Sequence, residues 1–315
     1  MLSIILCFFL LIIIKTSVEI NASNGIPSQG LSIIKYIGLR DNSLYKFTGE
    51  NVTVAIVDSG IAPHNDIEGH RIIKSIDFVN NKDNKMYDDY GHGTFVAGII
   101  GANGALVGIA PEVNFIAIKT INEFGETDEN KLSLALNWIY ENREKYNIRL
   151  VYLSAGKYIP QDRGNSKIKF YVEILNTEGI IIVCPSGNEG PNKDSVLFPA
   201  TIKNVLTVGT VNNNYTYDLE DDKLASFSSW SESRHKPELV TVGIDILSLS
   251  NISGDSYSLN SGTSFSAAVV TGVIALMLES DPNATVETIR NQLLTNRKNT
   301  IDYQPWSGEL FFINK

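Results

Sequence analysis

The sequence of 315 residues contains only two cysteines, Cys7 and Cys184. Two cysteines cannot form a disulfide framework, and Cys7 lies in a segment that maturation can remove. Positive charge is also scarce, because 26 Lys and Arg residues stand against 35 Asp and Glu residues, giving a net charge of −9. Nucleic-acid binding needs a surplus of cationic side chains that neutralise phosphates. We therefore exclude a disulfide-stapled module, a cysteine-based zinc site and a protein whose main partner is nucleic acid.

Long apolar runs are nearly absent as well. The one run, Leu2 to Ile14, is shorter than the roughly twenty residues that span a bilayer, and it has the length of a signal-peptide core. Its first basic residue, Lys15, follows the run, so the usual positive start is missing. We expect a hydrophobic signal-like segment over 1–22, and hence a secreted or N-terminally membrane-associated protein. The alternative is an apolar extension on a cytoplasmic enzyme.

The rest of the chain has an ordinary globular composition, with 43% hydrophobic and 19% charged residues. That composition excludes intrinsic disorder and a polytopic membrane protein. Short apolar runs predict buried strands over 51–57, 114–121, 149–153, 179–183 and 204–211. Helical patterns separate or follow them over 95–102, 129–146, 167–178 and 264–279. This alternation predicts an α/β fold with a mostly parallel sheet and helices on both faces. We expect one domain over 36–305, a linker or pro-segment over 23–35 and a C-terminal tail over 306–315.

Unusual residues lie where the predicted strands end, which is the edge where such folds bind ligands. Asp58 ends the first strand, His92 sits between two glycines, and Ser264 opens the last apolar helix. Asn188 follows another strand. Taken singly, each has a structural interpretation as a turn residue, a packed histidine or a helix cap. Together they give Asp, His and Ser in the chain order of subtilisin, with an added amide side chain.

The motifs around these residues carry a family resemblance. They read VAIVDSGI, GHGTFVAG, SGNEG, ASFSSW and GTSFSAA in chain order. With them the chain resembles the subtilisin-like serine proteases (subtilases) over roughly 50–280, and it looks most like the lantibiotic leader peptidases. No G-x-S-x-G elbow and no H-E-x-x-H motif occurs, which excludes the usual α/β-hydrolases and the zincins.

The resemblance implies a subtilisin-like fold and a serine endopeptidase that works through an acyl-enzyme. Ser264 would be the nucleophile, His92 the base that takes its proton, and Asp58 the group that orients the imidazole. The Asn188 amide and the Ser264 backbone N–H would hold the oxyanion. In subtilisin, losing one such donor lowers kcat by about 10²–10³.

Three features depart from the family pattern. Ala268 and Val269 stand where most subtilases have Pro and His. The segment 101–108 is shorter than the loop that binds calcium in secreted subtilisins, so we expect no required metal and no other cofactor. Only a short segment separates the apolar run from the first strand, where secreted subtilases carry a long prodomain. The trimmed layout resembles that of leader peptidases.

Subtilases bind an extended peptide by adding it as a strand between two exposed segments. The resemblance implies a substrate cleft that includes Ser154, Ala155, Gly156, Leu197, Glu126 and Glu129. Leu197 would lie at the base of the S1 pocket and make it shallow and apolar. Glu126 and Glu129, with Glu123 and Asp128, would give the S2–S4 rim a preference for basic residues, unless they form only a solvated acidic loop.

The leading hypothesis is a serine endopeptidase that removes the leader from a lantibiotic or bacteriocin precursor. The alternatives are a general degradative extracellular subtilisin-type protease and an inactive peptide-binding pseudoprotease. A nucleotide-binding domain is discounted, because neither G-x-G-x-x-G nor a P-loop follows the first strand. We expect a monomer whose partner is the peptide substrate. The remaining histidines, His64, His70 and His235, are expected at the surface, and Cys184 in the core.

Overall fold

The computed structural model describes residues 20–21, 33–83, 85–154, 166–295, 297–303 and 306–311. Apart from residues 20–21, the predicted signal-like segment lies outside the described residues. The same is true of Ala155 and Gly156, two of the predicted substrate-binding residues.

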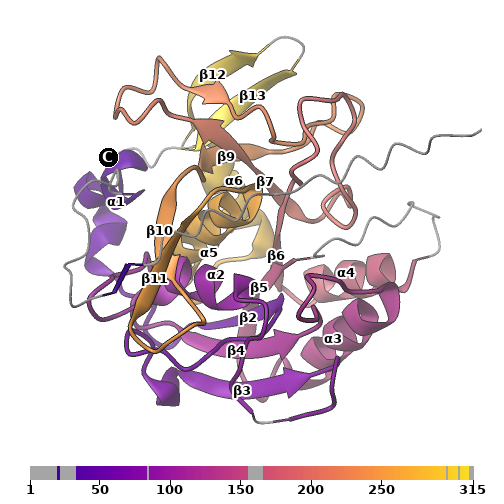
Figure 1. The fold of residues 1–315 in the computed structure, drawn as a ribbon. Coiled ribbons are helices and arrows are strands. Elements are labelled where there is room, and N and C mark those ends of the chain that lie inside the picture. Colours follow the sequence, from indigo (N-terminus) through magenta and orange to yellow (C-terminus); the bar gives the residue numbers. More distant parts are fainter. Residues whose placement is uncertain are drawn as a thin grey trace, which may run out of the picture.

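A large sheet forms the centre of the molecule (Figure 1), with the strand order β12-β13-β9-β7-β6-β5-β2-β4-β3 and β8 paired to β7. Its strands are β2 (Thr53–Asp58), β3 (Ile72–Asp77), β4 (Asn114–Lys119), β5 (Ile148–Leu153), β6 (Ile181–Pro185), β7 (Leu206–Asn212), β8 (Lys223–Leu224), β9 (Leu239–Val242), β12 (Arg297–Tyr303) and β13 (Trp306–Phe311). The pairs from β3 through β9 along this order are parallel. The predicted α/β class with a mostly parallel sheet is confirmed.

Six helices of the described chain accompany the sheet. They are α1 (Ile33–Tyr36), α2 (His92–Gly101), α3 (Glu129–Asn142), α4 (Lys167–Thr177), α5 (Thr263–Ser280) and α6 (Val286–Thr295). One buried cluster joins apolar residues of α3 and α4 to one face of the sheet, and Cys184 lies in it with 1% of its surface exposed. A second cluster contains α2 and α5 on the other face. The two clusters explain why the strands are apolar on both sides.

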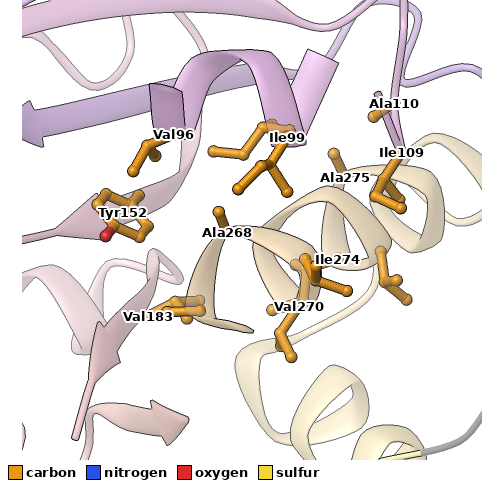
Figure 2. Packing of buried hydrophobic residues seen from close by; sticks show 14 of the residues in the cluster. Val96, Ile99, Ile109, Ala110, Tyr152, Val183, Ala268, Val270, Ile274 and Ala275 are labelled. Carbon is orange, nitrogen blue, oxygen red and sulfur yellow. The ribbon is translucent and has the colours of Figure 1, made fainter. Parts of the chain in front are cut away.

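Helix α5 is the core helix of the second cluster. It is long and apolar enough to cross a membrane, yet 83% of its apolar window is buried within the fold. Figure 2 shows its Ala268, Ala275 and Ile274 among Val96 and Ile99 of α2, with Tyr152 of β5 nearby. Ala268 is fully buried, so this position serves packing in the core.

A smaller sheet of three strands lies beside the main one. It consists of β1 (Ile20–Asn21), β11 (Ser256–Asn260) and β10 (Ile246–Leu249), and both pairings are antiparallel. At the other end of the chain, β13 pairs with β9 through Leu310 and Val240. Residues 306–311, assigned above to a tail, therefore extend the main sheet beyond residue 305.

The expectation that three histidines lie at the surface is wrong for His64. Only 5% of His64 is exposed. Its Nε2 lies 3.0 Å from the Ser256 carbonyl oxygen, and its Nδ1 accepts the Asp66 N–H at 3.1 Å. Both ring nitrogens are thus satisfied inside the fold, which makes burial possible. His70 and His235 are exposed.

Candidate active site

Asp58 and His92 meet at the carboxyl edge of the sheet. Asp58 is the last residue of β2 and is fully buried, whereas the His92 side chain keeps 21% of its surface exposed. The His92 Nδ1 lies 2.9 and 2.8 Å from the two Asp58 carboxylate oxygens. An ionised carboxylate can only accept, so this contact places a proton on Nδ1, and when the ring is neutral its lone pair is on Nε2. That is the tautomer a general base needs.

Ser59 connects the two members of this pair. Its backbone N–H donates to the Asp58 Oδ1 at 2.7 Å, and its hydroxyl oxygen accepts the Gly93 N–H at 2.9 Å. Gly93 is required here, because a Cβ at this position would lie 2.1 Å from the Gly60 carbonyl oxygen. The absence of that atom lets the first turn of α2 pack directly against the end of β2.

Asp88 fixes the turn that leads into His92. Its carboxylate accepts the backbone N–H of Gly91 at 2.7 Å and both the N–H and hydroxyl of Thr94 at 2.9 and 2.7 Å. Gly91 has φ of 94°, a left-handed conformation that glycine adopts without strain. The start of α2 is therefore capped, and the His92 backbone is held on both sides.

Ser264 is the second residue of α5 and is partly exposed. The next side chain, Phe265, has its ring 5.9 Å from the His92 ring and 4.4 Å from the Phe95 ring. These contacts pack the start of α5 against the start of α2. The Ser264 carbonyl oxygen also accepts the hydroxyl of the buried Tyr152 at 3.3 Å. The predicted nucleophile and base therefore belong to adjoining helix ends.

Asn188 lies against the same end of α5. Its side-chain oxygen accepts the Thr263 N–H and the Thr263 hydroxyl, both at 3.0 Å. With the oxygen so engaged, the amide NH₂ is the group turned away from Thr263. Within the described part of the chain, neither this NH₂ nor the Ser264 backbone N–H donates a hydrogen bond to a protein group. Two donors at a helix N-terminus can stabilise a developing oxyanion.

Two phenols, that of the fully buried Tyr152 and that of the partly buried Tyr90, lie near the Asp58 carboxylate. Burial raises the pKa of Tyr152 well above its ordinary value, and the negative charge of Asp58 raises it further. Burial and then the charges of Asp58 and Asp88 likewise raise the pKa of Tyr90. Both phenols stay protonated, so they can donate hydrogen bonds and add no charge near the predicted triad.

Several residues that hold this site were missed in the sequence. Thr263 belongs to the GTS motif and locks Asn188, and Ser229 of the ASFSSW segment accepts the Glu189 N–H at 3.0 Å. Lys119 is 2% exposed and bonds the Ser59 carbonyl oxygen at 2.9 Å. The sequence feature that could have revealed Lys119 is the presence of a charged residue at the end of the apolar strand NFIAIK.

The predicted cleft residues occupy different settings. Leu197 packs on Gly187, since a Cβ on Gly187 would lie 2.8 Å from the Leu197 Cγ, and its N–H donates to the Ser186 carbonyl at 3.0 Å. Leu197 thus lies beside the Asn188 loop, while Ser154 is buried directly after β5. These two predictions fit the geometry and remain predictions about substrate.

The predicted acidic rim divides into two parts. Glu123 and Glu126 are exposed on a turn whose Phe124 and Glu126 N–H groups donate to the Asn122 side chain at 3.0 and 2.9 Å. Glu129 instead accepts the Ser166 hydroxyl at 2.8 Å, at the start of α4. Asp128 caps α3 and pairs with Lys131. The charge that faces solvent comes mainly from the turn.

The segment that resembles a shortened calcium loop carries a different arrangement. The Asp66 carboxylate accepts the N–H groups of Ala105 and Leu106 at 3.0 and 2.8 Å and the Tyr257 hydroxyl at 2.9 Å. A calcium ion needs oxygen ligands directed at it, whereas these groups present hydrogen atoms. The residues at this loop do not fit a calcium ion.

Comparisons with known proteins identify the family of the chain. Residues 49–307 match the model of the Subtilase family. Serine protease AprX of Bacillus subtilis (strain 168) is 33% identical over 274 residues, which cover 79% of this chain and 61% of that protein. Minor extracellular protease Epr of the same organism is 32% identical over 261 residues, covering 81% and 36%. The chain thus spans less than two thirds of either relative.

A solved structure shows the same architecture. The S41 psychrophilic protease superposes with a TM-score of 0.73 at 25% identity, covering 86% of this chain and 91% of that one. The family match spans the strand that ends in Asp58, both helix starts and the Asn188 loop. The chain therefore belongs to the subtilase family.

Proposed function

We propose that this chain hydrolyses peptide bonds through Ser264, His92 and Asp58, and that its substrate is the leader region of a bacteriocin precursor. The observation that carries the catalytic part is the contact of the His92 Nδ1 with both Asp58 oxygens. It supports an imidazole whose Nε2 can take the Ser264 proton during attack on the peptide carbonyl. The same Nε2 then returns the proton to the leaving amine.

Acyl transfer then proceeds in two steps. The Ser264 Oγ bonds to the carbonyl carbon, and the amine leaves with the proton from His92. Water attacks the acyl-enzyme, gives its proton to His92 and releases the acid while Ser264 is re-protonated. The Asn188 amide and the Ser264 N–H stabilise the oxyanion in both steps, as their position at the start of α5 supports.

Two features of the cleft support a narrow substrate range. Leu197 fills the space over Gly187, next to the Asn188 loop, and this favours a shallow apolar S1 pocket. Glu123 and Glu126 are exposed on the rim turn, which favours basic residues upstream of the cut. The second candidate function is that of a general extracellular protease. It is supported by the similarity to Epr, which is described as a minor extracellular protease. Secretion is proposed on the same ground.

Mass spectrometry of cleavage products separates these candidates. Wild-type protein and Ser264→Ala would each be incubated with casein and with a set of modified-peptide precursors. One cut at a leader–core junction, absent with Ser264→Ala, is the expected result. Many Ser264-dependent cuts in casein would replace the leader-peptidase proposal with the general protease.

The acidic rim gives a second test, with a matched control. Glu126→Gln should lower kcat/KM for substrates with basic P2–P4 residues and leave neutral substrates unchanged. Glu129→Gln should have a smaller effect, because the Glu129 carboxylate is engaged with Ser166. Glu141→Gln, on the exposed last turn of α3, controls for loss of negative charge. Equal losses for all substrates would refute the rim preference.

A further inference from the structure

We propose that Lys119 is a positioning residue that sets the geometry of the Asp58–His92 pair. The proposal rests on the serine-peptidase function proposed above and adds to it a residue outside the triad. Lys119 ends β4, and its side chain is 3% exposed. A buried ammonium is costly unless every N–H finds an acceptor, so its partners reveal its role.

Each of its three ammonium hydrogens has an acceptor on a different segment. Nζ donates to the Ser59 carbonyl at 2.9 Å, to the Ile121 carbonyl at 2.7 Å and to the Asp89 carboxylate at 2.5 Å. Ser59 directly follows the triad aspartate, and Asp89 precedes His92 by three residues. Ile121 begins the turn that forms the acidic rim. One charged group thus joins the three loops that surround the catalytic pair.

The contact with Ser59 is the one that reaches the triad. The Ser59 N–H donates to the Asp58 carboxylate and its hydroxyl accepts the Gly93 N–H, so Ser59 fixes both members of the pair. Lys119 holds the remaining backbone acceptor of the same residue. Without the ammonium, the peptide after Ser59 loses its anchor, and the carboxylate can rotate away from the imidazole.

A second buried lysine provides a matched control. The Lys236 side chain is 4% exposed, and its Nζ donates to the Val205 carbonyl at 2.7 Å and to Glu238 at 2.6 Å. Lys236 precedes β9 and Val205 precedes β7, so this ion pair lies at the amino edge of the sheet, opposite the triad. Lys119→Met and Lys236→Met therefore remove equivalent buried charges, and only one of them touches a loop of the catalytic pair.

The test measures kcat and KM separately on a fluorogenic peptide, with active sites titrated. Lys119→Met should lower kcat by about 100-fold, the cost of a small misplacement, and leave KM within about threefold. Inactivation of Lys119→Met by phenylmethylsulfonyl fluoride should slow to a similar extent. The rate of this reaction reports on Ser264 and His92 and does not depend on binding in the upstream substrate subsites. Lys236→Met should change kcat by less than about threefold. Equal effects of the two variants on kcat, or a loss confined to KM, would overturn the proposal.

Two further measurements keep the proposal testable. The proton on the His92 Nδ1, hydrogen-bonded to Asp58, gives a downfield NMR resonance that should move upfield or broaden in Lys119→Met and stay in place in Lys236→Met. This signal does not depend on peptidase activity, so an inactive wild-type protein would refute the proposed function and leave this test intact. If Lys119→Met does not fold, Asp89→Asn takes its place, with a loss of kcat of about tenfold expected. An unchanged kcat and resonance in Asp89→Asn would overturn the proposal.

Discussion

Replacing Gly93 by alanine tests how the fold brings His92 to Asp58. The new Cβ would lie 2.1 Å from the Gly60 carbonyl oxygen and 3.2 Å from the Asp58 Cβ. Relief of the first contact requires a shift of about 1 Å at the start of α2, and a shift of this size can cost about 100-fold in rate. The distance between the His92 Nδ1 and the Asp58 carboxylate is now 2.8 Å. A shift of about 1 Å away from Asp58 would lengthen this distance beyond the range of a hydrogen bond.

We therefore expect Gly93→Ala to lower kcat by about 100-fold and to destabilise the fold by about 1–3 kcal/mol. The assay is steady-state hydrolysis of a fluorogenic peptide, combined with urea denaturation followed by circular dichroism. Gly69→Ala is the control, because a Cβ there meets only the Met86 methyl group at 4.0 Å. A kcat for Gly93→Ala within about threefold of that of Gly69→Ala would refute the reasoning.

Two further predictions concern stability. Burial raises the pKa of Asp222 to about 7. Between about pH 4 and 7 the folded protein therefore holds a proton that the unfolded chain releases. Its unfolding free energy falls as the pH rises through that range. Between pH 5 and pH 8 the unfolding free energy of Asp222→Asn, measured by urea titration, should fall by roughly 2–4 kcal/mol less than that of the wild-type protein. An equal fall in both proteins would contradict the assignment. One oxygen of Glu279 accepts the N–H groups of Thr48, Gly49 and Glu50 at 2.8, 2.5 and 3.2 Å. Glu279→Ala should lower the unfolding free energy by roughly 2–3 kcal/mol, against less than about 0.5 kcal/mol for the exposed Glu287→Ala, and equal losses would argue against this anchor.

The sequence predicted the parts of the site that lie within short motifs. Each of the four lies at the end of a buried strand, shortly after one, or in the first turn of a helix, and local patterns reveal such positions: Asp58, His92, Asn188 and Ser264. Their order along the chain then led to the proposed chemistry. The α/β class followed from strand–helix alternation, since apolar runs buried on both faces need helices on each side.

Contacts between distant segments could not be predicted in this way. His64 lies between proline and asparagine and looked exposed, yet its ring bonds Ser256 of β11 and the Asp66 backbone. The sequence predicted Glu129 as part of a charged rim but not its hydrogen bond with Ser166, which caps the next helix. Lys119 is another such case, because its partner Ser59 directly follows the neighbouring strand β2. Partners of this kind are set by the topology of the sheet.

Covalent labelling of Ser264 tests the central claim most directly. The protein would be treated with a fluorophosphonate, digested and mapped by mass spectrometry, alongside Ser264→Ala and His92→Ala. The account predicts one stoichiometric adduct on Ser264, none in Ser264→Ala and a strongly slowed reaction in His92→Ala. An adduct on another serine, or equal labelling of Ser264 with and without His92, would contradict it.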